Sequence, residues 1–391
     1  MKKQLLLLFV IYLIFIALGL PDALLGSAWN LVREDLNTSL STLGLMTIAV
    51  YSMSVFATFN APRIMRFMET KYITLISVMF TGLALIAMSQ VTSFYQMLFF
   101  AIPLGLGAGA IDVSLNHYLA ANYQAKHMNY LHSFYGIGVT VGPTIMAATL
   151  QGNSWRNGYI IVGCLLLTIA LIAFISRPLW KKEHKEERNT EHAHITLKEI
   201  LSTKGAVLSI LIFLLYVHIE SLGGVWIASY FYIEKEITYA TAALFTTTYY
   251  GALTIGRLLS GFLSQKITSQ WLVRIGQILI VTAGISMFIP HQLLWLSFVS
   301  VFLFGFGSAP IYPNMMFLNS VYFDRQKLSK IISLQMALGY MGFGVLTPLA
   351  GLFFDRVSIA FYPVFITLMG SILLIITFVF LKQKPVKSTS A

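Results

Sequence analysis

The sequence predicts an all-α integral membrane protein whose twelve transmembrane helices form two pseudo-symmetric halves of six. Three observations predict this class: the composition is strongly apolar, long apolar segments recur along the whole chain, and basic residues gather on alternate connections. Of the 391 residues, 57% are hydrophobic and only 10% are charged, whereas soluble globular proteins are roughly 45–50% apolar and about 25% charged.

Each apolar segment is long enough to cross the hydrocarbon core, which is about 30 Å thick and needs about 20 helical residues. The first segment follows two lysines, as in a signal peptide, but its apolar run is too long and continues into Pro21 and Asp22. We therefore expect it to be the uncleaved first helix. In chain order the segments cover residues 4–28, 42–62, 73–90, 94–122, 128–150, 157–176, 205–232, 238–264, 271–290, 293–318, 328–352 and 358–381.

The basic residues predict how these helices are oriented. The net charge is +11, and most Lys and Arg residues lie on one set of alternate connections. The other set holds only Arg33, Arg156, Lys235 and Arg356. By the positive-inside rule the basic set is cytoplasmic. We expect a multi-pass protein of the cell membrane with both termini in the cytoplasm, in contact with the lipid bilayer and not with nucleic acid.

Residues 177–204 are dense in charges of both signs and are predicted to form a cytoplasmic linker. They separate an N-terminal half, residues 1–176, from a C-terminal half, residues 205–391, which ends in a short cytoplasmic tail. Within the linker, "TLKEI" at 196–200 is typical of a capped amphipathic turn that lies on a membrane surface.

The two halves share short sequence patterns at matching places. Span four reads "GLGAGAIDVSLN" from Gly105, and span ten reads "GFGSAPIYPNMM" from Gly305. Span five has "GIGVTVGP" at 136–143, and span eleven has "GFGVLTP" at 342–348. Such repetition is typical of transporters whose binding site lies near the bilayer midplane, between the repeats.

Three acidic side chains, Asp22, Asp112 and Glu220, lie well inside the spans. A charge at a helix centre costs about 2.5–3.5 kcal/mol on insertion scales, so such residues usually face a bundle interior or a wet cavity. Asp112 and Asn116 share a helix face, and we expect Asp112 to handle a proton or the substrate; the alternative is a permanently paired acid. Asp22 follows Pro21, which predicts a kink, and the alternative for it is an acid that reaches the surface.

Other side chains in the spans are candidates for lining a substrate cavity. Glu220 stands in "YVHIESLGGVWIASYF", where an acid, aromatics and a glycine pair suit a sugar; the alternative is an acid that only packs helices together. His132 shares a face with Tyr135, and the alternative for it is an interhelical hydrogen bond. The residues expected to bind substrate are Asn116, His132, Tyr135, Glu220, Trp226, Tyr230 and Tyr312.

The chain resembles the major facilitator superfamily over its whole length, which implies the major facilitator fold. The loop "APRIMRFMETK" at 61–71 is a degraded form of that family's Gly-x-x-x-Asp-Arg-x-Gly-Arg-Arg motif, in which Arg66 survives while Met65 and Met68 replace the usual acid and glycine. The matching loop "GRLLSGFLSQK" keeps Arg257 and Gly261. We expect a structural or gating role for Arg66, Arg257, Gly138 and Pro143, with Arg257 able to pair with a carboxylate or a loop carbonyl.

More specifically, the chain is similar to the fucose, galactose and glucose proton symporters. "PDALL" places Asp22 where those proteins carry a first-span Asp, and Asp112 and Asn116 follow the glycines of span four at the family's spacing. "HIESLGGVW" resembles a seventh-span segment of the glucose type. The resemblance implies proton coupling by Asp22 and Asp112. The usual Glu is shortened to Asp112, the first-span asparagines are missing and His132 stands where Gln is common, so the sugar preference does not follow.

The sequence therefore predicts a secondary active transporter and not an enzyme. We expect proton-coupled symport of a sugar or similar small polar solute by alternating access, in a monomer that uses the proton gradient and needs no cofactor or metal. No ATP-binding motif is present. The alternative is a proton-coupled exporter of drugs or metabolites, because "GIGVTVGP" loosely resembles the glycine-proline motif that antiporters carry in span five. A sensor or lipid-handling protein on the same fold has no sequence signal beyond the weak loop motif.

Overall fold

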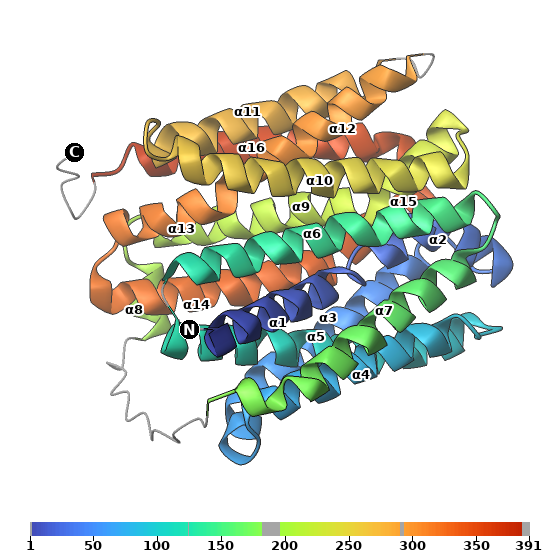
Figure 1. Ribbon diagram of the computed structural model, residues 1–391. Coiled ribbons are helices and arrows are strands. Elements are labelled where there is room, and N and C mark those ends of the chain that lie inside the picture. Colours follow the sequence, from blue (N-terminus) through green and yellow to red (C-terminus); the bar gives the residue numbers. More distant parts are fainter. Residues whose placement is uncertain (1, 124, 182–195, 290–292, 385–391) are drawn as a thin grey trace.

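A computed structural model shows the chain as a bundle of long helices that run alongside one another (Figure 1). The structure describes residues 2–123, 125–181, 196–289 and 293–384, and these ranges contain no β-strand. Ten helical stretches among them are long and apolar enough to cross a membrane. Two further helices, α10 (Tyr239–Leu263) and α11 (Ser269–Ser286), lie in the bundle beside them. Helices suit a bilayer because each satisfies its own backbone hydrogen bonds.

The first half of the chain forms six membrane-crossing segments, the first of which is broken into two helices. Figure 1 shows that α1 begins and α16 ends at the same end of the bundle, so both termini lie there. The helices are α1 (Lys2–Gly19), α2 (Leu24–Asp35), α3 (Thr42–Phe67), α4 (Thr70–Met88), α5 (Phe94–Asn122), α6 (Ala125–Leu150) and α7 (Trp155–Ile175).

The second half repeats this order with a break in a different place. In addition to α10 and α11, this half contains α9 (Ala206–Lys235), α12 (Leu294–Ser308), α13 (Ile311–Tyr322), α14 (Arg325–Met341), α15 (Thr347–Arg356) and α16 (Tyr362–Leu381). A π-helical segment, η2 (Gly342–Leu346), joins α14 to α15, and a short 3-10 turn, η3 (Ile359–Phe361), precedes α16.

Glycine contacts confirm the predicted repeat. A methyl group at Gly105 would overlap the backbone of α3, and one at Gly305 would overlap the backbone of α10, the equivalent helix of the other half. Gly107 lies against the Thr81 hydroxyl and the Ser77 backbone oxygen of α4, and Gly307 lies against the Gly276 backbone oxygen of α11. The shared glycine pattern therefore records shared close packing of the fourth segment of each half against the second and third.

Two membrane-crossing segments are broken within the bundle. The kink predicted at Pro21 is a full break, because α1 ends at Gly19 and α2 begins at Leu24. The tenth segment, which the sequence predicts as one helix, is interrupted between Ser308 and Ile311, beside Pro310. Non-helical backbone at membrane depth is tolerated where it lies against protein or lines a cavity. We therefore expect the two breaks to lie against protein or beside a cavity, and not against lipid.

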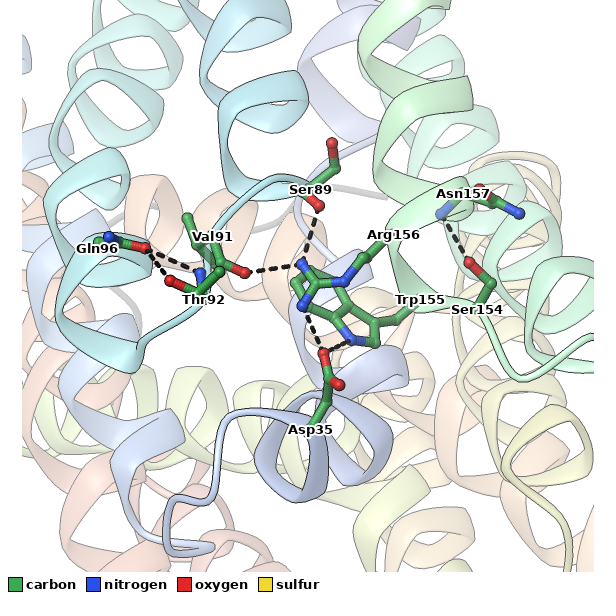
Figure 2. A network of polar contacts seen from close by, with 9 residues as sticks. All are labelled: Asp35, Ser89, Val91, Thr92, Gln96, Ser154, Trp155, Arg156 and Asn157. Atoms are coloured by element: carbon green, nitrogen blue, oxygen red, sulfur yellow. Dashed lines mark hydrogen bonds and ion pairs between the residues drawn. The ribbon is translucent and has the colours of Figure 1, made fainter.

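A polar cluster joins three helices of the first half at the end opposite the termini. Arg156 donates to the backbone oxygens of Ser89 and Val91 at 2.9 and 2.8 Å and pairs with Asp35 at 2.6 Å (Figure 2). Trp155 donates its indole N–H to the same carboxylate at 3.0 Å. The cluster links the end of α2, the α4–α5 connection and the start of α7, so these elements are held as one unit.

Only the two ends of the predicted linker can be described, because residues 182–195 lie outside the described part of the chain. A 3-10 turn, η1 (Arg177–Leu179), follows α7, and a short helix, α8 (Leu197–Leu201), precedes α9. Thr196 and Glu199 form the predicted capping box at the start of α8. Leu197 and Leu201 are exposed and Ile200 is buried, and the position of this turn on a membrane surface stays a prediction.

We expect Gly105→Ala to destabilise the protein, because the added methyl group overlaps the backbone of α3. Overpacking of this kind typically costs about 1–3 kcal/mol. The matched control is Gly261→Ala on α10, where a methyl group meets no atom within 4 Å and gains up to about 1 kcal/mol of helix propensity. Melting temperatures of the purified variants in detergent test this; equal values would contradict the packing role.

Candidate functional site

Asp22 lies in the break between α1 and α2, in the middle of the first membrane-crossing segment. Its side chain is exposed, and the Tyr135 hydroxyl of α6 donates to Asp22 Oδ2 at 2.5 Å. Tyr51 of α3 and Tyr250 of α10 also lie within electrostatic range of this carboxylate. The exposed carboxylate of Asp22 therefore lies among groups from both halves of the chain.

Asp112 faces the same region from α5. The side-chain amide of Asn116 donates to both the backbone oxygen and Oδ1 of Asp112, each at 2.8 Å, so the predicted shared face exists. Asp112 lies within electrostatic range of Asp22, and of Tyr312 and Tyr340 from the other half. Two carboxylates and several phenol groups therefore converge near the centre of the bundle, and we call this group of side chains the central cluster.

The third acid of the spans is neutralised by a cation. Arg257 Nη2 lies 3.0 Å from Glu220 Oε1, and their side chains are 29% and 17% exposed. The other carboxylate oxygen of Glu220 accepts a hydrogen bond from Tyr216, and Tyr249 donates to the backbone oxygen of Glu220 at 3.1 Å. Arg257 thus has a carboxylate as its partner, which is one of the two partners predicted for it. Asp22 and Asp112, by contrast, form no ion pair with any described residue.

Two residues that the sequence predicts to bind substrate, His132 and Tyr312, belong to the central cluster. His132 of α6 has an exposed side chain, lies within electrostatic range of Arg257 and packs edge-on against Phe15 at 5.8 Å. Tyr312 of α13 is half-buried, packs against Phe213 at 5.4 Å and lies within electrostatic range of Arg257. Both halves therefore supply polar groups to the cluster.

Several aromatic residues of the cluster are absent from the predicted set. Tyr51 of α3 stacks on Phe343 of η2, with ring centroids 4.6 Å apart, and so joins the two halves. Tyr250 and Tyr340 are half-buried and face the acids described above. The only sequence signal for them is a phenol group within an apolar span, which does not say whether the ring faces lipid, packing or cavity.

Trp226 and Tyr230, by contrast, lie away from the cluster. Trp226 is fully buried and donates its indole N–H to the backbone oxygen of Thr347 at 3.2 Å. Tyr230 is buried, donates to the backbone oxygen of Met287 at 3.2 Å and stacks on Tyr362. The polar atoms of both side chains thus bond within the second half, and a substrate-binding role for them stays a prediction.

The residues expected to act in gating occupy three different settings. A methyl group at Gly138 would meet the backbone of α1 at Ile16, so this glycine permits close contact between α1 and α6. Pro143 is buried within α6. Arg66 is exposed in the last turn of α3. A gating role for them stays a prediction.

The two halves meet closely at the end opposite the termini. Gly26, one turn beyond Asp22, faces the backbones of Gly224 and Val225 so closely that no side chain fits between them. Gly44 of α3 lies against Pro348 of α15 in a similar way. The bundle is therefore closed on this side of Asp22.

Polar contacts accompany this closure. Glu34 of α2 accepts hydrogen bonds from Tyr232 of α9, at 3.0 Å, and from Tyr239 of α10. Ser41 donates to Asp355 Oδ2 of α15 at 2.7 Å. These pairs link the first half to the second through exposed groups, whose hydrogen bonds can be exchanged for water if the halves separate.

Comparisons with known proteins agree with this architecture. Residues 11–236 and 209–391 each match the model of the Major Facilitator Superfamily. The chain is 21% identical to the glucose/mannose transporter GlcP of Bacillus subtilis (strain 168) over 357 residues, which cover 87% of this chain and 86% of that protein. A crystal structure of a mutant of the nucleoside transporter NupG has a TM-score of 0.76 at 13% identity, and the match covers 97% of this chain and 99% of that one.

A second relative matches a smaller part of its own length. The chain is 22% identical over 310 residues to bypass of stop codon protein 6 of Saccharomyces cerevisiae (strain ATCC 204508 / S288c), and these residues make up 71% of this chain. They span 62% of the length of the yeast protein.

We expect Glu220 and Arg257 to be energetically coupled. Either Glu220→Gln or Arg257→Gln leaves one charge without its partner and should cost about 1.5–3 kcal/mol, the range for hydrogen bonds to charged groups. The double variant removes both charges and should cost clearly less than the two single losses together. Thermal or denaturant unfolding in detergent measures the cycle, and strictly additive losses would mean that the pair contributes no coupling.

Proposed function

Because the chain belongs to the Major Facilitator Superfamily, we propose that this membrane transporter moves a sugar or similar small polar solute together with protons. The observation that carries the proposal is Asp22, a carboxylate in a helix break that is exposed inside the bundle and has no basic partner among the described residues. Asp112 lies within its electrostatic range.

The proton-coupling role follows from the cost of charge in a membrane. An unpaired carboxylate that faces a wet cavity can be ionised, but closing the cavity around it buries the charge at considerable cost. Binding a proton removes that charge, so the loaded protein closes more easily than the empty one. This differential stability is what couples an ion gradient to a conformational cycle. We assign the proton to Asp22 and Asp112 because Glu220 is already neutralised by Arg257.

The central cluster favours a solute rich in hydroxyl groups. Asn116, His132 and the phenol groups of Tyr51, Tyr250 and Tyr340 offer both donors and acceptors, and the rings of Tyr51 and Phe343 offer an aromatic surface. Hydroxyls satisfy such polar groups, while the C–H faces of a sugar ring suit the aromatic surface. The match to GlcP, which is named as a glucose/mannose transporter, supports the same solute class.

The contacts at the opposite end fit alternating access. The basic residues predict that both termini lie on the cytoplasmic side of the cell membrane. In that orientation the contact between Gly26 and Gly224 closes the outer side of the transporter. We propose that a monomer passes between this state and one in which the halves separate there. The exposed hydrogen bonds of Glu34 and Ser41 would then break without leaving buried groups unsatisfied.

We expect Asp22→Asn and Asp112→Asn to abolish proton-driven accumulation while sparing solute exchange. Asn keeps the shape of the side chain but cannot bind and release a proton. Proteoliposomes with an imposed proton gradient measure accumulation, and counterflow with solute on both sides measures exchange. In the wild type, addition of the transported sugar should make the outside medium more alkaline.

The matched control is Asp324→Asn, an exposed acid at the start of α14, which should accumulate solute as the wild type does. Full accumulation by Asp112→Asn would remove that residue from the coupling role. The failure of hexoses and pentoses to bind at all would overturn the sugar assignment, and solute-driven acidification outside would point to export.

A further inference from the structure

Arg257 is a basic side chain beside the central cluster. It lies on α10 within electrostatic range of Tyr216 and Tyr135, of His132 and of Tyr312. Its side chain keeps 29% of its surface exposed. A guanidinium in such a setting is the group that would bind an anionic solute, because its fork of N–H donors matches the two oxygens of a carboxylate.

Glu220 occupies this guanidinium. Its Oε1 lies 3.0 Å from Arg257 Nη2, and its Oε2 is held by the Tyr216 hydroxyl. The Tyr249 hydroxyl fixes the backbone of the same residue at 3.1 Å. Tyr216 and Tyr249 are themselves buried, so the hydrogen bonds that position Glu220 come from side chains packed inside the bundle.

This arrangement determines which net charge a solute can carry into the cavity. An anion would find Arg257 already neutralised, and it would approach the carboxylates of Glu220, Asp22 and Asp112. Like charges brought together at a binding site are strongly unfavourable. A neutral sugar meets no such repulsion and uses the hydroxyl, amide and aromatic groups instead.

We propose that Glu220 sets the charge selectivity of the cavity by occupying the guanidinium with which the carboxylate of a sugar acid would pair. Glu220 is thus an internal substitute for an anionic solute and excludes hexuronates in favour of neutral hexoses. The inference rests on the proposed transport of sugars and specifies the class of sugar.

The test compares ligand-induced thermal stabilisation of the purified full-length protein. The probes are glucose, mannose and galactose, the corresponding hexuronates, and the neutral methyl esters of those hexuronates. The wild type should be stabilised by at least one hexose and by its uronate ester, but not by the free uronate. In Glu220→Gln the affinity for that uronate should rise at least about tenfold, as expected for one new charge-assisted hydrogen bond.

Two variants separate the release of Arg257 from a general change in charge. Asp112→Asn also removes one negative charge, but it leaves the Glu220–Arg257 pair in place, so the ratio of uronate to hexose affinity should rise clearly less than in Glu220→Gln. The double variant Glu220→Gln/Arg257→Gln should lose the uronate binding that the single variant gains. An equal gain in Asp112→Asn, or a gain that survives in the double variant, would overturn the proposal.

The wild type alone also tests the inference, whether or not Glu220→Gln folds. Wild-type protein that binds the free uronate as tightly as the ester would overturn the exclusion while leaving sugar transport intact. The exclusion is equally overturned if a hexose stabilises the wild type but a monodisperse Glu220→Gln gains no uronate affinity. Wild-type protein that responds to none of these hexoses or esters would overturn the inference, and if pentoses also failed to bind, the proposed sugar transport would be overturned with it.

Discussion

An ionised side chain inside a bilayer must be paired or reached by water, and this constraint organises the centre of the protein. Glu220 and Arg257 meet it by pairing across α9 and α10. Asp22 meets it differently, because its carboxylate is exposed to the interior of the bundle and receives a hydrogen bond from Tyr135. The helix break at Asp22 obeys the same constraint, since irregular backbone at membrane depth needs a cavity or protein beside it.

Close glycine contacts provide the scaffold on which these charged groups stand. Gly105 and Gly305 bring the fourth segment of each half against its second, and Gly26 brings α2 against α9 at the opposite end. Without side chains at these positions the helix backbones touch directly. Such interfaces suit a protein whose halves move as units around a central site.

The two halves share a scaffold but divide the chemistry between them. The first half carries Asp22 and Asp112, which have no basic partner among the described residues, whereas the second carries the neutralised Glu220 and Arg257. At the place of Asp112 the second half has Tyr312, on a segment that is broken at Pro310. If the fold alone required a polar anchor there, both halves would need one. Under our proposals, the first half handles protons and the second selects the charge of the solute.

The sequence by itself determined the class, the repeat and which acids lie inside the membrane-crossing segments, because hydrophobicity, glycine spacing and residue type are local properties that do not depend on contacts. It also located the helix break at Pro21 and the shared face of Asp112 and Asn116. Only the tertiary structure decided that Glu220 pairs with Arg257, that Tyr51, Tyr250 and Tyr340 face the acids, and that Trp226 and Tyr230 do not. An aromatic or charged residue within an apolar helix has the same local signature whether it faces lipid, a neighbour or a cavity, and only the packing of distant helices distinguishes these cases.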